Sequence, residues 1–122
     1  MMTRGIRGAT TSTANTREAI LEATTEMLER LIEANALDKE TIGAALFTTT
    51  RDLNADFPAV AARLLGWTEI ALMCSHEMDV PGALPSCIRV MVLVNTDKKP
   101  GEIVNVYLRG AVNLRNPATE DR

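Results

Sequence analysis

An arginine, Arg89, lies inside an almost continuously apolar stretch, residues 87–93. A strand of this kind has apolar side chains on both faces, so the guanidinium of Arg89 is expected to be at least partly buried. Because a guanidinium cannot lose its proton, burial is unfavourable unless an anion lies beside it. Two partners fit equally well: an internal carboxylate, such as Glu77 or Glu69, or a bound anionic ligand.

A second arginine, Arg7, has small neighbours. Gly5 and Ala9 share its face of a predicted strand, which leaves space beside the long side chain, as a pocket requires. An edge-strand arginine in water is the commoner alternative. Ten of the thirteen basic residues are arginines, whose planar fork matches carboxylates and phosphates. A species bias toward arginine would give the same count.

Glu77 follows a predicted strand, where a carboxylate can reach a site at the rim of the sheet. Most residues in such positions are solvated loop charges, and a lone histidine beside them, here His76, is usually exposed and idle. The sequence contains no GxSxG elbow, phosphate-binding loop or CxxC pair. If the protein is an enzyme, its chemistry needs neither a nucleophile nor a metal, and no cofactor is expected.

The 122 residues have the composition of a small globular protein, with a net charge of −3 that argues against nucleic-acid binding. The longest apolar run, residues 90–94, is too short to cross a membrane, and the N-terminus lacks an apolar signal segment. A cytoplasmic protein is expected, with Cys74 and Cys87 as free thiols. Residues 1–115 should form one domain, followed by a polar tail at 116–122. So small a domain favours sites shared between subunits.

Strands and helices must together position these side chains. Strands are predicted at residues 4–11, 42–48, 68–73 and 86–95, the last of them central, and a further short segment carries Tyr107. The clearest helix is capped by Thr16 and stops near Asn35. A shorter helix is predicted from a cap at Asp56 to Gly66. These elements predict an α+β fold, an α/β sandwich in which helices pack against a mixed sheet.

Several segments taken together resemble one family. They are residues 4–11, 52–53, 57–59 with Arg63, 74–80, 87–90, 106–108, and Ala111 with Leu114 and Arg115. The family that they resemble is the monofunctional chorismate mutases of the small trimeric α/β class. The likeness covers nearly the whole chain, and its most specific stretch is residues 74–80, followed by Gly82, Leu84 and residues 87–90. It implies a homotrimer in which three sheets form a pseudo-barrel.

The resemblance implies a Claisen rearrangement of chorismate to prephenate, in phenylalanine and tyrosine synthesis. One ether C–O bond breaks and one C–C bond forms without proton transfer, in agreement with the missing catalytic dyad. By similarity, Arg89 stabilises negative charge on the ether oxygen, and Glu77 accepts a hydrogen bond from the ring hydroxyl. Arg7 binds the other end of the dicarboxylate with help from Tyr107, and Cys74 lines the same pocket.

The resemblance also implies that each site lies in a cleft between two subunits. Phe57 and Arg63 would come from the neighbouring subunit. Leu114 and Arg115 would help to close the site, with the C-terminal tail as a loose cover.

Two positions depart from the family pattern. Val60 stands where a lysine near the substrate is common, and Met73 stands where a small polar residue is common. Arg51 is a candidate to replace the missing positive charge. Two other functions use an arginine at a subunit cleft or paired arginines: a trimeric imine deaminase of the RidA type, and a non-catalytic trimeric metabolite-binding module.

Overall fold

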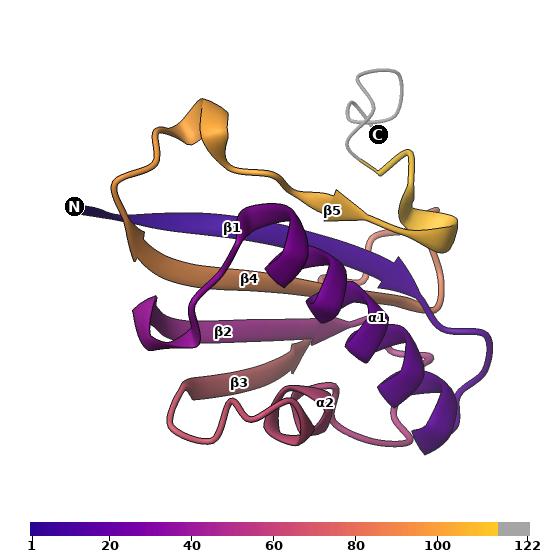
Figure 1. Ribbon diagram of the computed structural model, residues 1–122. Coiled ribbons are helices and arrows are strands. Elements are labelled where there is room, and N and C mark those ends of the chain that lie inside the picture. Colours follow the sequence, from indigo (N-terminus) through magenta and orange to yellow (C-terminus); the bar gives the residue numbers. More distant parts are fainter. Residues whose placement is uncertain (115–122) are drawn as a thin grey trace.

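The computed structural model describes residues 1–114 and shows a five-stranded mixed sheet with helices on one of its faces (Figure 1). The strands are β1 (Met2–Thr11), β2 (Ile42–Thr49), β3 (Ala71–His76), β4 (Cys87–Thr96) and β5 (Val106–Tyr107). The α-helices are α1 (Arg17–Asn35) and α2 (Ala59–Leu64), and short 3₁₀ turns are η1 (Lys39–Thr41), η2 (Pro100–Glu102) and η3 (Arg109–Ala111). The predicted α+β fold is confirmed.

The strands lie in the order β3-β2-β4-β1-β5, so β4 is central, as predicted. β4 pairs antiparallel with β1 and β2, whereas β3 pairs in parallel with β2 and β5 pairs in parallel with β1. A parallel pair needs a long crossover, and α2 lies in the crossover from β2 to β3. Arg7 lies on β1 and Arg89 on β4, and because β1 pairs with β4 the two arginines lie on neighbouring strands.

Helix α1 forms because its sequence supplies both a cap and an apolar stripe. The Thr16 side chain accepts a hydrogen bond of 3.1 Å from the backbone N–H of Ala19, and Glu18 puts negative charge in the first turn. The buried stripe consists of Ile20, Ala23, Thr24, Met27, Leu28 and Leu31. The helix ends at Asn35, as predicted. No helix among residues 1–114 is long and apolar enough to span a membrane.

Helix α2 is shorter than predicted. It begins at Ala59, after Pro58, and the Asp56 side chain does not cap it. The Asp56 carboxylate instead forms an ion pair with Arg17 and accepts a hydrogen bond of 2.7 Å from the backbone N–H of Phe57. Asp56 therefore holds the loop before the helix against the start of α1.

Strand β3 lies three residues further along the chain than the predicted strand at 68–73. Its extent is set by the parallel ladder with β2, which continues until His76 lies opposite Thr49. The second half of the strand, residues 74–76, lacks an alternation of apolar residues, so the sequence pattern alone does not reveal that the strand continues there. Trp67 precedes the strand and is buried in the core.

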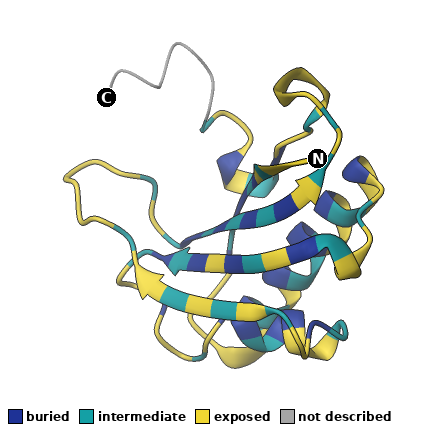
Figure 2. Ribbon diagram, turned by 90° about the vertical axis from the view of Figure 1, so that its left-hand side faces the viewer, coloured by how far each residue is buried: buried dark blue, intermediate teal, exposed yellow. Residues whose placement is uncertain are grey.

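The helices cover one face of the sheet, and residues along β4 alternate accordingly (Figure 2). Facing the helices, and buried, are Ile88, Val90, Val92 and Val94. Facing the other way, and half-buried, are Arg89, Met91 and Leu93. Within residues 1–114 no helix lies on this second side, here called the open face. It exposes apolar side chains, among them Leu46 and Met73 on neighbouring strands. Arg89 is partly buried, as predicted.

Candidate active site

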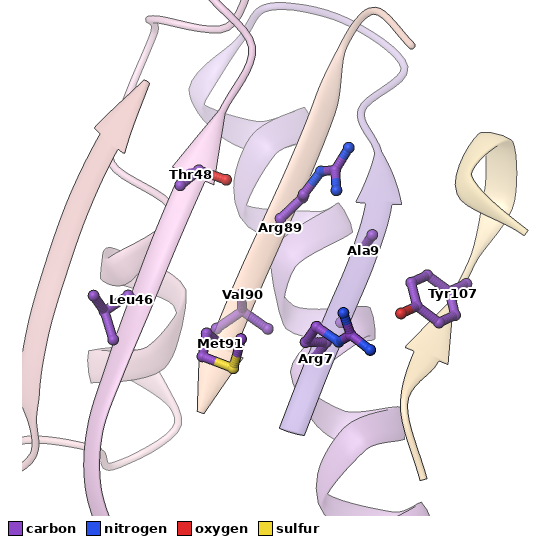
Figure 3. Close-up of a pocket in the computed structure, with 9 residues that line it drawn as sticks. Arg7, Ala9, Leu46, Thr48, Arg89, Val90, Met91 and Tyr107 are labelled. Atoms are coloured by element: carbon purple, nitrogen blue, oxygen red, sulfur yellow. The ribbon is translucent and has the colours of Figure 1, made fainter. Parts of the chain in front are cut away.

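A hollow of about 240 Å³ lies on the open face (Figure 3). It is lined by Arg7, Gly8, Ala9, Leu46, Thr48, Arg89, Val90, Met91 and Tyr107. Strand register explains the position: Ala9 pairs with Arg89 on one side and Tyr107 on the other, and Thr48 pairs with Arg89. Because Ala9 carries only a methyl group, the larger side chains on each side of it flank unfilled space. This is the arginine hollow.

Arg89 has a carboxylate beside it. Its Nε atom lies 3.7 Å from Oε2 of Glu77, too far for a hydrogen bond but close enough for an ion pair. The same carboxylate oxygen accepts a hydrogen bond from the Thr48 hydroxyl. Of the two internal carboxylates that the sequence suggested for Arg89, the structure selects Glu77. The Nε atom is nevertheless buried and makes no hydrogen bond to any residue from 1 to 114.

Arg7 and Tyr107 face each other across the hollow (Figure 3). The backbone N–H of Arg7 donates a hydrogen bond of 2.8 Å to Oδ1 of Asn105, which ties β1 to the start of β5. Among residues 1–114, Arg7 has no ion-pair partner, and the buried Tyr107 hydroxyl has no hydrogen-bond partner. Buried polar atoms are rarely left unpaired, so this arrangement suits a ligand with anionic oxygens.

Phe57 and Cys74 lie in a second hollow, of about 340 Å³, between β3 and the loop before α2. We call it the Phe57 hollow. Burial raises the pKa of the Cys74 thiol, while a hydrogen bond from the Ala59 backbone and the positive charge of Arg63 act in the opposite direction. Phe57, Arg63 and Cys74 therefore belong to one neighbourhood.

The two hollows share no lining residue. Within one chain, Cys74 therefore lies with Phe57 and not with Arg89. The reason is strand alternation. Cys74 packs against the core on the helix-covered side of β3, whereas Arg89 lies on the open face of β4.

Leu114 is at the end of the described residues. Its backbone N–H donates a hydrogen bond of 3.0 Å to the carbonyl of Ala111, and its side chain is half-buried. It does not line the arginine hollow. Arg115 and the tail at 116–122 lie outside the described residues.

Thr48 is a site residue that the sequence reasoning missed. It lies across from Arg89 in the β2–β4 ladder, and its hydroxyl bonds the carboxylate that pairs with Arg89. The only signal available was a threonine near the end of a predicted strand. That signal could not be read without knowing which residue of β4 it would oppose.

Known proteins similar to this chain agree on one family. Residues 3–118 match the model of the family described as chorismate mutase type I. The chain is 48% identical over 115 residues to chorismate mutase AroH of Thermus thermophilus, a match that covers 93% of this chain and 94% of that protein. It is also 48% identical over 116 residues to chorismate mutase AroH of Bacillus subtilis, covering 94% and 91%.

A solved structure extends the likeness to three dimensions. The structure of a chorismate mutase from Clostridium thermocellum matches with a TM-score of 0.87 and 52% sequence identity, covering 88% of this chain and 96% of that one. The fold and the arginine hollow define a small α+β protein suited to an anionic ligand. The chain belongs to the chorismate mutase type I family, which confirms the resemblance found in its sequence.

Proposed function

We propose that this chorismate mutase converts chorismate to prephenate, a step of aromatic amino acid biosynthesis, in the arginine hollow. One observation carries the assignment of the site. Among residues 1–114, the buried Nε of Arg89 and the buried hydroxyl of Tyr107 have no hydrogen-bond partner, and both residues line the same hollow as Arg7, which has no ion-pair partner in that range. The substrate is a compact dicarboxylate whose oxygens match these donors.

The chemistry asks for positioning and electrostatics only. Rearrangement within one molecule needs neither a proton transfer nor a covalent intermediate, so the protein must hold the reactive conformer and stabilise developing charge. In this proposal Arg89 lies at the ether oxygen, where its interaction strengthens as the C–O bond breaks. A rigid guanidinium is favoured there, and the ion pair with Glu77 restricts its motion.

The remaining polar groups orient the substrate. Arg7 and Tyr107 hold a carboxylate, and Glu77 accepts a hydrogen bond from the ring hydroxyl. The Thr48 hydroxyl already occupies one Glu77 oxygen, which supports a fixed carboxylate with its other oxygen available to the substrate. The Glu77 side chain is about 29% exposed and pairs with Arg89, although Glu77 is not itself among the residues that line the arginine hollow.

The site is completed, in this proposal, by a neighbouring copy in a homotrimer. The arginine hollow lies on an open, partly apolar sheet face, and Phe57 is 65% exposed on the same chain. Exposed apolar surfaces of this kind mark protein interfaces. Phe57, Arg63 and Cys74 of one copy would then cover the arginine hollow of the next, with Leu114 and Arg115 helping to close it.

Other functions have less support. The family match favours neither an imine deaminase nor a non-catalytic module. Action in the cytoplasm is supported by Cys74 and Cys87, which are both free thiols, since reducing compartments preserve thiols.

The test is a direct assay of chorismate consumption, with prephenate identified as the product. Purified protein should accelerate the reaction far above the rate in buffer. Arg89→Ala should lower kcat by a factor of about a hundred to a thousand. Arg30→Ala is the matched control, because Arg30 is exposed on α1, on the other side of the sheet. A wild-type rate equal to that of buffer would disprove the function.

A further inference from the structure

Ser86, the residue immediately before β4, has an unusual backbone conformation. Its φ of 52° lies in the left-handed region, which a residue with a side chain adopts only at an energetic penalty. Ser86 closes the loop that begins at Glu77, and it lies three residues before Arg89. The direction in which the chain enters β4 is therefore set at a strained position between two site residues.

One side chain holds Ser86 in this conformation. Oδ2 of Asp52 accepts a hydrogen bond of 2.9 Å from the backbone N–H of Ser86 and lies 3.5 Å from its hydroxyl. On the opposite side, the Ser86 carbonyl accepts a hydrogen bond of 2.9 Å from the backbone N–H of Ser12. Ser86 is thus fixed through both its N–H and its carbonyl.

The second oxygen of Asp52 extends the network to β4 itself. It accepts a hydrogen bond from the Thr50 hydroxyl, and that hydroxyl in turn accepts one of 2.9 Å from the backbone N–H of Cys87. The backbone N–H of Thr50 also donates to the Cys87 carbonyl, at 3.0 Å. The carboxylate therefore joins the loop after β2 to the first residue of β4.

We propose that Asp52 is a positioning residue for Arg89. Its carboxylate keeps Ser86 left-handed, and this fixes the point from which β4 carries Arg89 into the arginine hollow. The proposal rests on the proposed function, because it assigns Asp52 a role in placing the guanidinium that acts on chorismate. Asp52 itself does not line that hollow.

The test compares kcat per folded chain for Asp52→Ala, Ser86→Gly and the double variant Asp52→Ala/Ser86→Gly. Asp52→Ala should lower kcat about tenfold or more, since a small misplacement of a catalytic group reduces the rate of reaction strongly. Glycine adopts a positive φ without help. The double variant should therefore recover most of the loss, whereas a merely stabilising role of Asp52 would leave kcat per folded chain unchanged.

Two further variants sharpen the test. Asp79→Ala removes an exposed carboxylate from the loop that Ser86 closes, one for which residues 1–114 provide no ion pair, and should leave kcat within about twofold, as expected for a surface change. Asp52→Asn retains an oxygen acceptor for the Ser86 N–H, so it should stay within about threefold of wild type. It also serves as the comparison if Asp52→Ala does not fold.

The outcomes separate this proposal from the function. An active wild type with unchanged kcat in Asp52→Ala overturns the positioning role alone, as does a double variant that is no better than Asp52→Ala. Asp52→Asn falling to the level of Asp52→Ala overturns the hydrogen-bond explanation. A wild type that does not consume chorismate overturns the function and this proposal together.

Discussion

Arg7 and Arg89 lie on neighbouring strands, but their surroundings differ. Arg89 already has Glu77 at 3.7 Å, so its charge is partly balanced and its guanidinium partly fixed before a ligand arrives. Arg7 has no ion-pair partner within residues 1–114, and it faces a tyrosine hydroxyl. A free cation attracts an anion in the ground state, whereas a fixed one gains most where charge develops during the reaction.

Replacing each arginine should therefore affect different kinetic constants. Arg7→Ala should raise KM about tenfold to a hundredfold, the effect of losing a hydrogen-bonded charge, with a smaller change in kcat. Arg89→Ala should act mainly on kcat. Steady-state kinetics with chorismate provide the measurement. Equal losses in kcat for the two variants would contradict the division of roles.

At this scale the sequence indicated some residues and concealed others. A charge inside an apolar strand made Arg89 a candidate, and two small neighbours made Arg7 one; both line the arginine hollow. The roles of Glu77 and Tyr107 came only through the family resemblance. Thr48 and Asp52 act through partners about 30 to 40 positions away in the chain, and only strand pairing shows which residues those are.

Among the elements, β5 depends most on its surroundings. It is two residues long, too short to be stable through its own ladder with β1. Asn35, at the end of α1, replaces the missing pairing: its side-chain amide donates to the Val104 carbonyl at 2.8 Å, and its Oδ1 accepts from the Val104 N–H at 2.9 Å. Tyr107 is therefore held in place from the C-terminus of a helix.

Asn35→Ala should lower the free energy of unfolding by about 1–3 kcal/mol, because a buried side chain that makes several hydrogen bonds is removed. Denaturant titration gives the value. Asn95→Ala is the matched control, since Asn95 is exposed and bonds the Thr3 hydroxyl; it should change the stability by less than about 0.5 kcal/mol. Equal effects of the two variants would argue against a stabilising role of the hydrogen bonds between Asn35 and Val104.

Elements with a complete pattern were predicted well. α1 has both a cap and an apolar stripe, and β4 is apolar throughout, so the sequence located both within a residue or so. β3 was misplaced because its polar half is defined by the ladder with β2. The cap at Asp56 was wrong because that carboxylate pairs with Arg17, which is distant in sequence.

On the scale of the whole molecule, the open face is not covered by any helix of residues 1–114. It carries the arginine hollow and exposed apolar side chains, among them Met73, which is 64% exposed. Met73 is also one of the departures from the family pattern. A larger apolar residue at this position fits a surface buried against another copy, which the proposed trimer would provide.

Met73→Glu should therefore weaken assembly. A charge buried in an interface without a partner is strongly unfavourable, so the mass in solution should fall below that of a trimer, and activity should fall with it. Met2→Glu is the control: Met2 is 62% exposed but lies on the side of β1 that faces the helices. Light scattering and the chorismate assay measure both effects. An unchanged mass for Met73→Glu would exclude this strand from the interface.

The separation of the arginine hollow from the Phe57 hollow has a consequence for mixed assemblies. In the proposed trimer each copy contributes its arginines to one site and its Phe57 side to another. A substitution in the arginine hollow of one copy would therefore disable one site, while the Phe57 hollow of the same copy would still serve another. Under this proposal, a chain lacking Arg89 and a chain lacking Arg63 have lost different halves of the site, and together they would still supply one complete set. If the two are assembled together, we expect a working site wherever the two intact halves meet.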